Sequence, residues 1–176
     1  MELNLTELET QRHHYLTIPA ALNMGHAASV CLESQGHSIQ ASMDGYGQFV
    51  KQYLITRFDV TDEMKRTWND EEFTTEQGAY GIAFLVASRE MNVKAIQKSR
   101  KKTGIDYWLG DKDNFLFQEK VRLEVSGIRN GNDQKVDARF NIKMRQSEKS
   151  DVTMLPALVV IIDFNKPQIK TGLRKV

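Results

Sequence analysis

Cysteine is almost absent from this sequence, which has one, Cys31, among its 176 residues. A single cysteine cannot form an internal disulfide, and no local base or motif marks Cys31 as a nucleophile, so we expect it in the core. The four histidines, His13, His14, His26 and His37, have no cysteine or Glu-x-x-His partners at zinc-binding spacing. Disulfide scaffolds are therefore excluded, and the pattern argues against structural zinc.

Long apolar runs are also lacking. No stretch approaches the roughly 18 apolar residues of a membrane helix, and the N-terminus carries the acidic Glu2 instead of the basic start of a secretion signal. We therefore expect a cytoplasmic protein with no membrane partner. A partner protein or a homodimer stays open.

An excess of either charge is lacking over the whole chain, but the charges are unevenly distributed along it. The net charge is +1, yet residues 1–70 carry 5 basic and 9 acidic residues, whereas residues 71–176 carry 19 and 14. The C-terminal part is therefore the one expected to face an anion. With 40% hydrophobic residues, the chain can bury one core, and we expect residues 1–176 to form a single α/β domain.

The most informative stretch runs from Gly104 to Gly127. Its two halves alternate between apolar and polar residues, which predicts two antiparallel strands joined by a turn at residues 111–114. Asp106 and Glu124 lie on the polar sides of these strands. Neighbouring strands lie about 4.8 Å apart, and carboxylates that close repel each other unless a proton or a divalent cation lies between them.

A helix is predicted over residues 74–91, with Thr74 and Gln77 at capping-box spacing. Glu76 shares its face with Ala79 and Ala83, so we expect this acid to point inward, towards a partner. The alternative is a solvated glutamate in the first helical turn, where the helix dipole favours it. A strand over residues 93–97 then leads into a basic run that ends two residues before Asp106, and its charges are Lys98, Arg100, Lys101 and Lys102.

A second helix is predicted from Asp133, as its cap, to about Lys149. Val136, Phe140 and Met144 recur every four residues and should pack on the sheet. A neighbouring polar stripe consists of Lys135, Arg139, Lys143 and Gln146. The apolar run 158–162 is expected to be a strand buried on both faces, followed by an exposed basic tail from residue 166. Before the core, residues 1–70 should add a helix over 20–35 and a hairpin over 38–58 with its turn at 44–47.

The order of these elements resembles the restriction-endonuclease-like superfamily, the PD-(D/E)xK nucleases, over residues 74–164. The resemblance implies a mixed sheet flanked by helices with an αβββαβ core, and Mg²⁺ (or Mn²⁺) held by Asp106, Glu124 and the helix residue Glu76. The family's lysine is replaced by Ser126, and Lys143, Lys101 or Lys102 would substitute for it. Gln146 resembles a helix glutamine of the exonuclease branches. The strand sequences also look like those of small uncharacterised bacterial proteins.

The expected function is metal-dependent hydrolysis of phosphodiester bonds, as an endonuclease or exonuclease, in DNA processing or defence. DNA is favoured over RNA as the partner, and the expected contacts are Lys98, Arg100, Lys101, Lys102, Lys135 and Arg139. One alternative is a catalytically inactive nuclease-like subunit for nucleic-acid binding or complex assembly. Another is a structural ion network that joins the two acids to Arg122, Lys120 or Lys101.

Overall fold

An eight-stranded mixed sheet organises the chain in a computed structural model that describes residues 1–113 and 116–176. The sheet order is β1-β3-β2-β8-β7-β6-β5-β4. The strands are β1 (Glu2–Asn4), β2 (Gln40–Gly47), β3 (Lys51–Thr56), β4 (Lys94–Lys98), β5 (Tyr107–Asp113), β6 (Leu116–Ile128), β7 (Ala157–Asp163) and β8 (Gln168–Arg174). The described residues therefore form one α/β domain, as expected.

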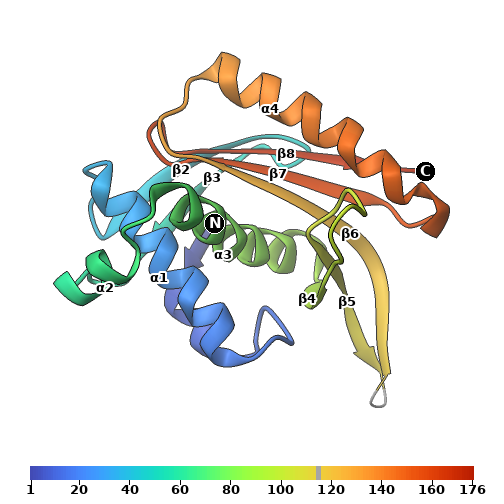
Figure 1. Cartoon of the computed structure of the whole chain (residues 1–176), viewed down its shortest axis with the longest axis horizontal. Helices are drawn as coiled ribbons and strands as arrows, with labels where there is room; N and C mark the ends of the chain where they lie inside the picture. Colours follow the sequence, from blue (N-terminus) through green and yellow to red (C-terminus); the bar gives the residue numbers. More distant parts are fainter. Residues whose placement is uncertain (114–115) are drawn as a thin grey trace.

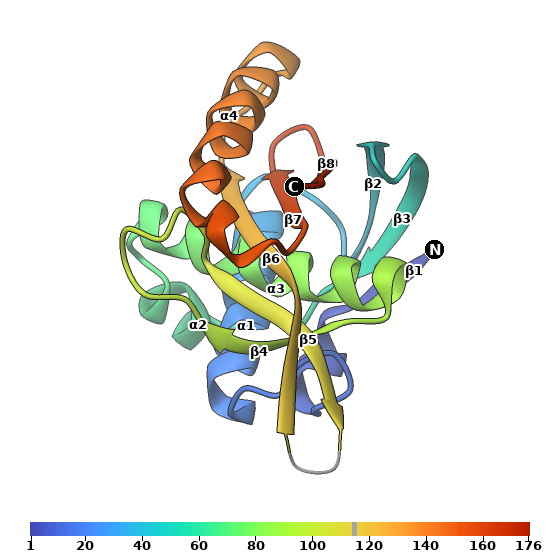
Figure 2. The same ribbon diagram turned by 90° about the vertical axis from the view of Figure 1, so that its right-hand side faces the viewer.

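Helices cover both faces of this sheet (Figure 1). They are α1 (Ile18–Ser34), α2 (Asp62–Thr67), α3 (Glu71–Met91) and α4 (Asp133–Gln146), with 3₁₀ helices η1 (Leu5–Glu9) and η2 (Ser147–Thr153). Helix α3 packs on β6 and β7 with α1 outside it, and α4 lies on the opposite face over β6, β7 and β8 (Figure 2). In the described part of the chain, no helix is both long and apolar enough to cross a membrane.

Helix α3 is the central helix of the larger core, and it begins earlier than predicted. Its N-cap is Asp70, whose carboxylate accepts a hydrogen bond from the Phe73 amide at 2.8 Å. The predicted capping box at Thr74 is therefore wrong: the Thr74 hydroxyl donates back to the Asp70 carbonyl instead. Gly78 lets α1 approach closely, because a Cβ there would lie 2.9 Å from the backbone of Ala28.

The predicted hairpin of β5 and β6 is present, with Tyr107 opposite Leu123 and Leu109 opposite Val121. Its turn was placed wrongly, because Asp111 to Asp113 continue β5 and pair with residues 116–118 of β6. The remaining predicted turn residue, Asn114, lies outside the described residues. The same error occurs at residues 44–47, which extend β2 and pair with both β3 and β8.

The predicted strand at 158–162 is confirmed as β7, and every residue of β7 is buried. The predicted exposed tail after residue 166 is wrong, since β8 inserts between β2 and β7 and buries Ile169 and Thr171. Backbone pairing on both sides of β8 therefore outweighs the polar character of its sequence.

Helix α4 packs on β7 through the predicted apolar stripe. Val136 forms a buried cluster with Val159 and Ile161 of β7, and Phe140 and Met144 pack against this cluster. Its N-cap is Asn132, one residue before the predicted Asp133, and the Asn132 side chain accepts from the amide of Lys135 at 2.9 Å. The helix also ends at Gln146 instead of reaching Lys149, because the chain tightens into η2.

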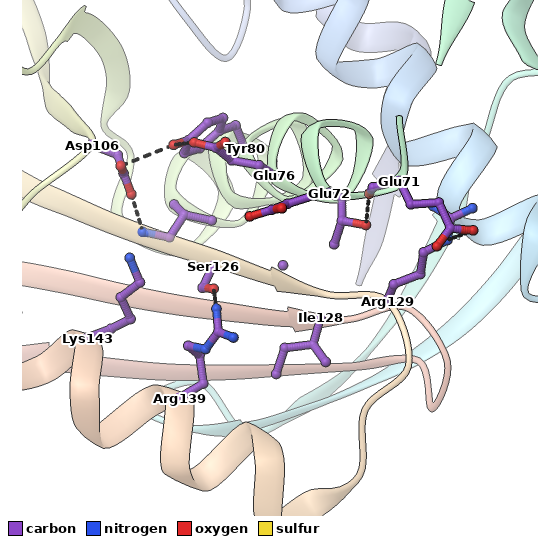
Figure 3. A pocket seen from close by; sticks show the side chains of 13 residues that line it. Glu71, Glu72, Glu76, Tyr80, Asp106, Ser126, Ile128, Arg129, Arg139 and Lys143 are labelled. Carbon is purple, nitrogen blue, oxygen red and sulfur yellow. Dashed lines mark hydrogen bonds and ion pairs between the residues drawn. The ribbon is translucent and has the colours of Figure 1, made fainter. Parts of the chain in front are cut away.

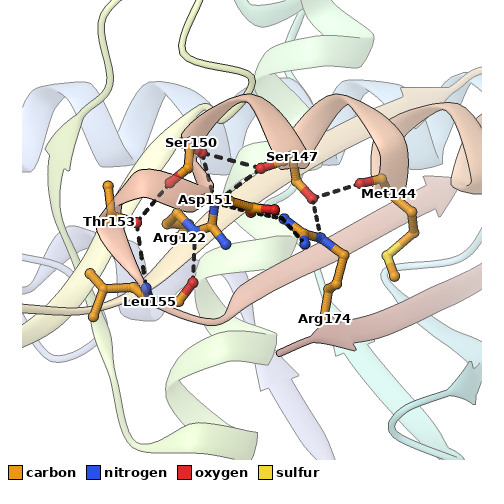
Figure 4. A network of polar contacts seen from close by, with 8 residues as sticks. All are labelled: Arg122, Met144, Ser147, Ser150, Asp151, Thr153, Leu155 and Arg174. Atoms are coloured by element: carbon orange, nitrogen blue, oxygen red, sulfur yellow. Dashed lines mark hydrogen bonds and ion pairs between the residues drawn. The ribbon is translucent and has the colours of Figure 1, made fainter. Parts of the chain in front are cut away.

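A buried arginine on β6 holds η2 in place. The Arg122 side chain is fully buried, and its Nε donates to the carbonyl of Leu155 at 2.8 Å. Its Nη1 donates to the Ser147 carbonyl, the Ser150 hydroxyl and the Asp151 carboxylate at 2.9–3.0 Å (Figure 4). Arg122 therefore pairs with η2, not with Asp106 or Glu124 as the ion-network alternative required.

Replacing Arg122 by Met is expected to lower the free energy of unfolding by about 2–4 kcal/mol, because it leaves the buried acceptors of η2 without their hydrogen-bond donor. Urea titration of the wild type and the variant measures this difference. Arg145→Met, at an exposed position of α4, is the control and should change stability by no more than about 0.5 kcal/mol. A loss below about 1 kcal/mol at Arg122 would show that η2 is held by other contacts.

Candidate functional site

The C-terminal part of β6 has a free edge. Pairing with β5 begins at Tyr107 opposite Leu123, so residues 124–128 of β6 extend past β5. A cavity of about 540 Å³ opens beside this edge, with α3 on one side and α4 on the other (Figure 3). The cavity therefore lies where the predicted hairpin, the acidic helix and the basic helix meet.

Asp106 lies directly before β5, at the start of this edge. Its backbone amide donates to the Leu123 carbonyl at 2.8 Å, and its Oδ2 accepts from the Val125 amide at 2.8 Å. Backbone groups alternate along a strand, so the Gly127 N–H points to the same side as the Val125 N–H, away from β7, and Gly127 lines the cavity. Only glycine fits at 127, because a Cβ would lie 2.4 Å from the carbonyl oxygen of Thr75 on α3.

Glu76 does not point into the core as predicted. It is exposed, and it lines the cavity at the edge of α3. The hydroxyl proton of Tyr80, one helical turn further on, is shared between Glu76 Oε1 at 2.7 Å and Asp106 Oδ1 at 3.1 Å. Burial and the charge of Asp106 raise the pKa of Tyr80 well above its usual value, so Tyr80 stays a neutral donor that links the two acids.

Glu124 of β6 is fully buried and is not among the residues that line this cavity. Its Oε1 accepts hydrogen bonds from the Lys143 ammonium and from Gln146 Nε2, the latter at 2.8 Å. Both donors come from α4, which packs on the face of the sheet opposite α3; Figure 3 shows Lys143 extending from α4 towards β6. The structure thus brings to Glu124 two residues that the resemblance singled out, Lys143 and Gln146.

The two hairpin acids share one electrostatic environment. Burial, followed by the charge of Asp106, raises the pKa of Glu124 from 4.5 to about 8, although Lys143 opposes that shift. Burial likewise raises the pKa of Asp106, and there the Val125 amide and Lys143 act in the opposite direction. Near neutral pH the pair therefore retains a proton that two exposed acids would have lost.

This pair makes stability depend on pH. Between pH 4.5 and about 8 the unfolded chain releases the Glu124 proton while the folded chain keeps it, so stability falls as pH rises through this window.

Asp106→Asn removes the repelling charge, so it should raise Tm at pH 8 by roughly 2–4 °C, equivalent to about 1 kcal/mol, and by less at pH 5. Thermal melts from pH 5 to 9 measure this change. Asp111→Asn, at a half-exposed acid on β5, should leave the pH profile unaltered.

The predicted nucleic-acid contacts lie in three places. Four of them line a second cavity of about 270 Å³, which also reaches Asp106: Lys98, Arg100, Lys101 and Lys102. Arg139 lines the first cavity, and its Nη1 donates to the Ser126 hydroxyl at 3.0 Å. Lys135 lies near the start of α4, where its ammonium donates to the Asn130 carbonyl at 3.2 Å. The structure therefore gathers Arg139 and the basic run around the acids but places Lys135 elsewhere.

Sequence reasoning missed three residues of the first cavity: Tyr80, Ser126 as a hydrogen-bonding partner, and Arg129. Tyr80 follows Glu76 by four residues, a helical spacing that could have revealed the pair. Arg129 has no comparable signal, because its contacts come from distant segments: Nη2 donates to Ser34 Oγ at 2.8 Å, and Nε lies 3.8 Å from Glu71 Oε1.

The alternative ion network does not match these contacts. Lys120 lies 3.9 Å from Asp111, Lys101 lines the second cavity, and the cation paired with Glu124 is Lys143. Within residues 1–113 and 116–176, no group of three or more His, Cys, Asp or Glu side chains is close enough to hold a metal ion. A three-acid centre of Glu76, Asp106 and Glu124 is thus not preassembled among the described side chains.

Comparison with protein-family models, with curated proteins and with solved structures finds no significant match to this chain.

Proposed function

We propose that the protein is a metal-dependent nuclease that hydrolyses phosphodiester bonds, with Asp106 and Glu124 as the ligands of Mg²⁺ or Mn²⁺. The observation that carries the proposal is the convergence of residues from the hairpin and from α4: Asp106 and Lys143 line the first cavity, and Lys143 and Gln146 both contact the buried Glu124. The order α3-β4-β5-β6-α4-β7 agrees with the αβββαβ core that the resemblance implies, and so supports it.

The donor atoms suit a hard cation. Glu124 Oε2 is buried and accepts no hydrogen bond from a donor in the described residues, so it has a lone pair available for a ligand. Asp106 supplies a second carboxylate, and two carboxylates with water are typical of magnesium sites. Exposed Glu76 could complete the set through a water molecule or a side-chain rotation.

Lys143 would compete with a metal ion for Glu124, since its ammonium contacts Glu124 Oε1. Its side chain is 18% exposed and borders the cavity, so it can leave Glu124 and turn towards a bound phosphate. Metal binding would then exchange one cation for another at Glu124. It would also require Glu124 to release its proton.

Each residue then has a task in hydrolysis. A bound Mg²⁺ supplies a Lewis acid that polarises the phosphate and lowers the pKa of water. The attacking water would form a bond to phosphorus and lose a proton to solvent, while the bond from phosphorus to the leaving oxygen breaks and that oxygen takes up a proton from solvent. Lys143 and the Gly127 N–H stabilise the charge that develops on the phosphate oxygens, while Gln146 holds the Glu124 carboxylate in position.

A second candidate function is a nucleic-acid-binding or assembly subunit without catalysis. The full burial of Glu124 and its ion pair with Lys143 favour this function, because a carboxylate that is already neutralised needs no metal. The two functions differ in one measurable property, the binding of a divalent cation.

Isothermal titration with Mn²⁺ tests the proposal. We expect one site in the wild type, with an affinity that rises from pH 6 to pH 8.5, because the raised pKa of Glu124, about 8, makes proton release part of binding. Glu124→Gln should abolish this site, whereas Asp111→Asn should retain it. If the wild type binds no Mn²⁺ at pH 8.5 and cuts no DNA or RNA, the binding-subunit function replaces the proposed one.

A further inference from the structure

The two cavities meet at the acids. Both are lined by Glu76, Tyr80 and Asp106, which stand at the boundary between them. The first cavity extends from this boundary along the free edge of β6 to Arg139, and the second extends to the loop after β4. The two cavities are therefore adjacent at Asp106, and a ligand that occupied both would lie across this carboxylate.

Positive charge lies on both sides of this boundary. Lys101, Lys102 and Lys149 line the second cavity, while Arg139 and Lys143 line the first. The α3 wall of the first cavity is acidic through exposed Glu71 and Glu72, so a polyanion would lie against β6 and α4 instead. The basic walls and the edge amide of Gly127 suit phosphates spaced along an extended backbone.

The size of the cavities favours one strand over two. The larger cavity, about 540 Å³, falls within the range typical of small-molecule sites, roughly 300–1,000 Å³. A duplex, whose major groove alone is about 12 Å wide, is too broad to enter a cavity of this volume. A single strand can enter, because its nucleotides are small enough to pass one at a time.

We infer that one nucleic-acid strand crosses the site through both cavities, so that cleavage falls inside a continuous chain and needs no free end. This inference rests on the proposed nuclease function and specifies its substrate as internal bonds of single-stranded nucleic acid. An exonuclease would instead need an obstruction that stops the strand beyond the acids. Here basic side chains continue on both sides of Asp106.

The test uses a covalently closed circle of single-stranded DNA and a linear strand of the same sequence, each with the full-length protein and Mn²⁺. We expect the circle to be converted first to full-length linear product, and Asp106→Asn to prevent this conversion. If the linear strand is shortened from an end while the circle stays intact, the inference is wrong and the nuclease proposal stands. If neither substrate is cut, both are wrong.

Binding of a labelled single strand tests the path itself. Lys101→Ala/Lys102→Ala and, separately, Arg139→Ala should each weaken binding about tenfold at low salt. Each should also reduce the slope of log affinity against log salt concentration. The slope should fall by about 0.7 for every phosphate of a single strand that the variant no longer neutralises. Arg66→Ala, at an exposed position of α2, is the control and should bind as the wild type does. If only one of the two basic groups affects binding, the strand does not cross the site and the inference is overturned.

Discussion

Asp106→Asn is expected to abolish Mg²⁺-dependent cleavage while leaving nucleic-acid binding within about twofold of the wild type. The substitution keeps an oxygen that can accept from the Val125 amide, so the end of β6 should hold its shape. It removes one of the two ligand charges on which the proposed metal site depends. Single-turnover cleavage and equilibrium binding, measured on the same oligonucleotide, separate the two effects.

The matched control is Asp111→Asn, because Asp111 lies in the same hairpin but is half exposed on β5, away from the cavity. It should cleave at the wild-type rate. Retention of cleavage by Asp106→Asn would remove Asp106 from the chemistry, whatever the effect on stability. An equal loss of binding and cleavage would instead indicate that Asp106 positions the nucleic-acid strand.

Lys143→Ala is expected to lower the rate of cleavage by about 10²–10³-fold, the effect typical of losing one electrostatic stabiliser of a transition state. The affinity for nucleic acid should fall far less, because other basic residues line both cavities. The variant should also raise the pKa of Glu124 further, since the Lys143 charge now lowers it. The cleavage rate of the variant should therefore recover partly as pH rises.

This pH response distinguishes a role in cleavage from a role in folding. Rate and affinity measured from pH 6 to 9 should show the pH optimum of Lys143→Ala shifted upward from that of the wild type. Arg145→Ala, at an exposed position of the same helix, should change neither rate nor optimum. Equal losses of rate and affinity at every pH would show that Lys143 contributes to binding alone.

Local patterns predicted the elements that carry the acids. The alternation around Asp106 and Glu124 identified the hairpin, because residues on one face of a strand recur every second position. The spacing of Val136, Phe140 and Met144 similarly identified α4 and its packed side. These predictions succeeded because each depends on residues that are neighbours in sequence.

The errors arose where distant contacts decide the structure. Residues after 166 are polar and resemble a tail, yet β2 and β7 supply backbone partners from both sides and make them the strand β8. Glu76 shares a helical face with alanines, yet it is exposed and lines the cavity beside the residues of β6 that β5 does not pair. Neither outcome is visible within a window of a few residues.

The sequence by itself determined which acids share a hairpin, which helix carries the basic stripe and that β7 is buried on both faces, since these follow from short periodic patterns. Only the tertiary structure decided that Lys143 and Gln146 contact Glu124, because they lie 19 and 22 residues further along the chain. It also decided that Glu124 is fully buried and that Asp106 helps to raise its pKa. The reason is physical: burial and pKa depend on everything packed around a group, whereas periodicity depends on the backbone alone.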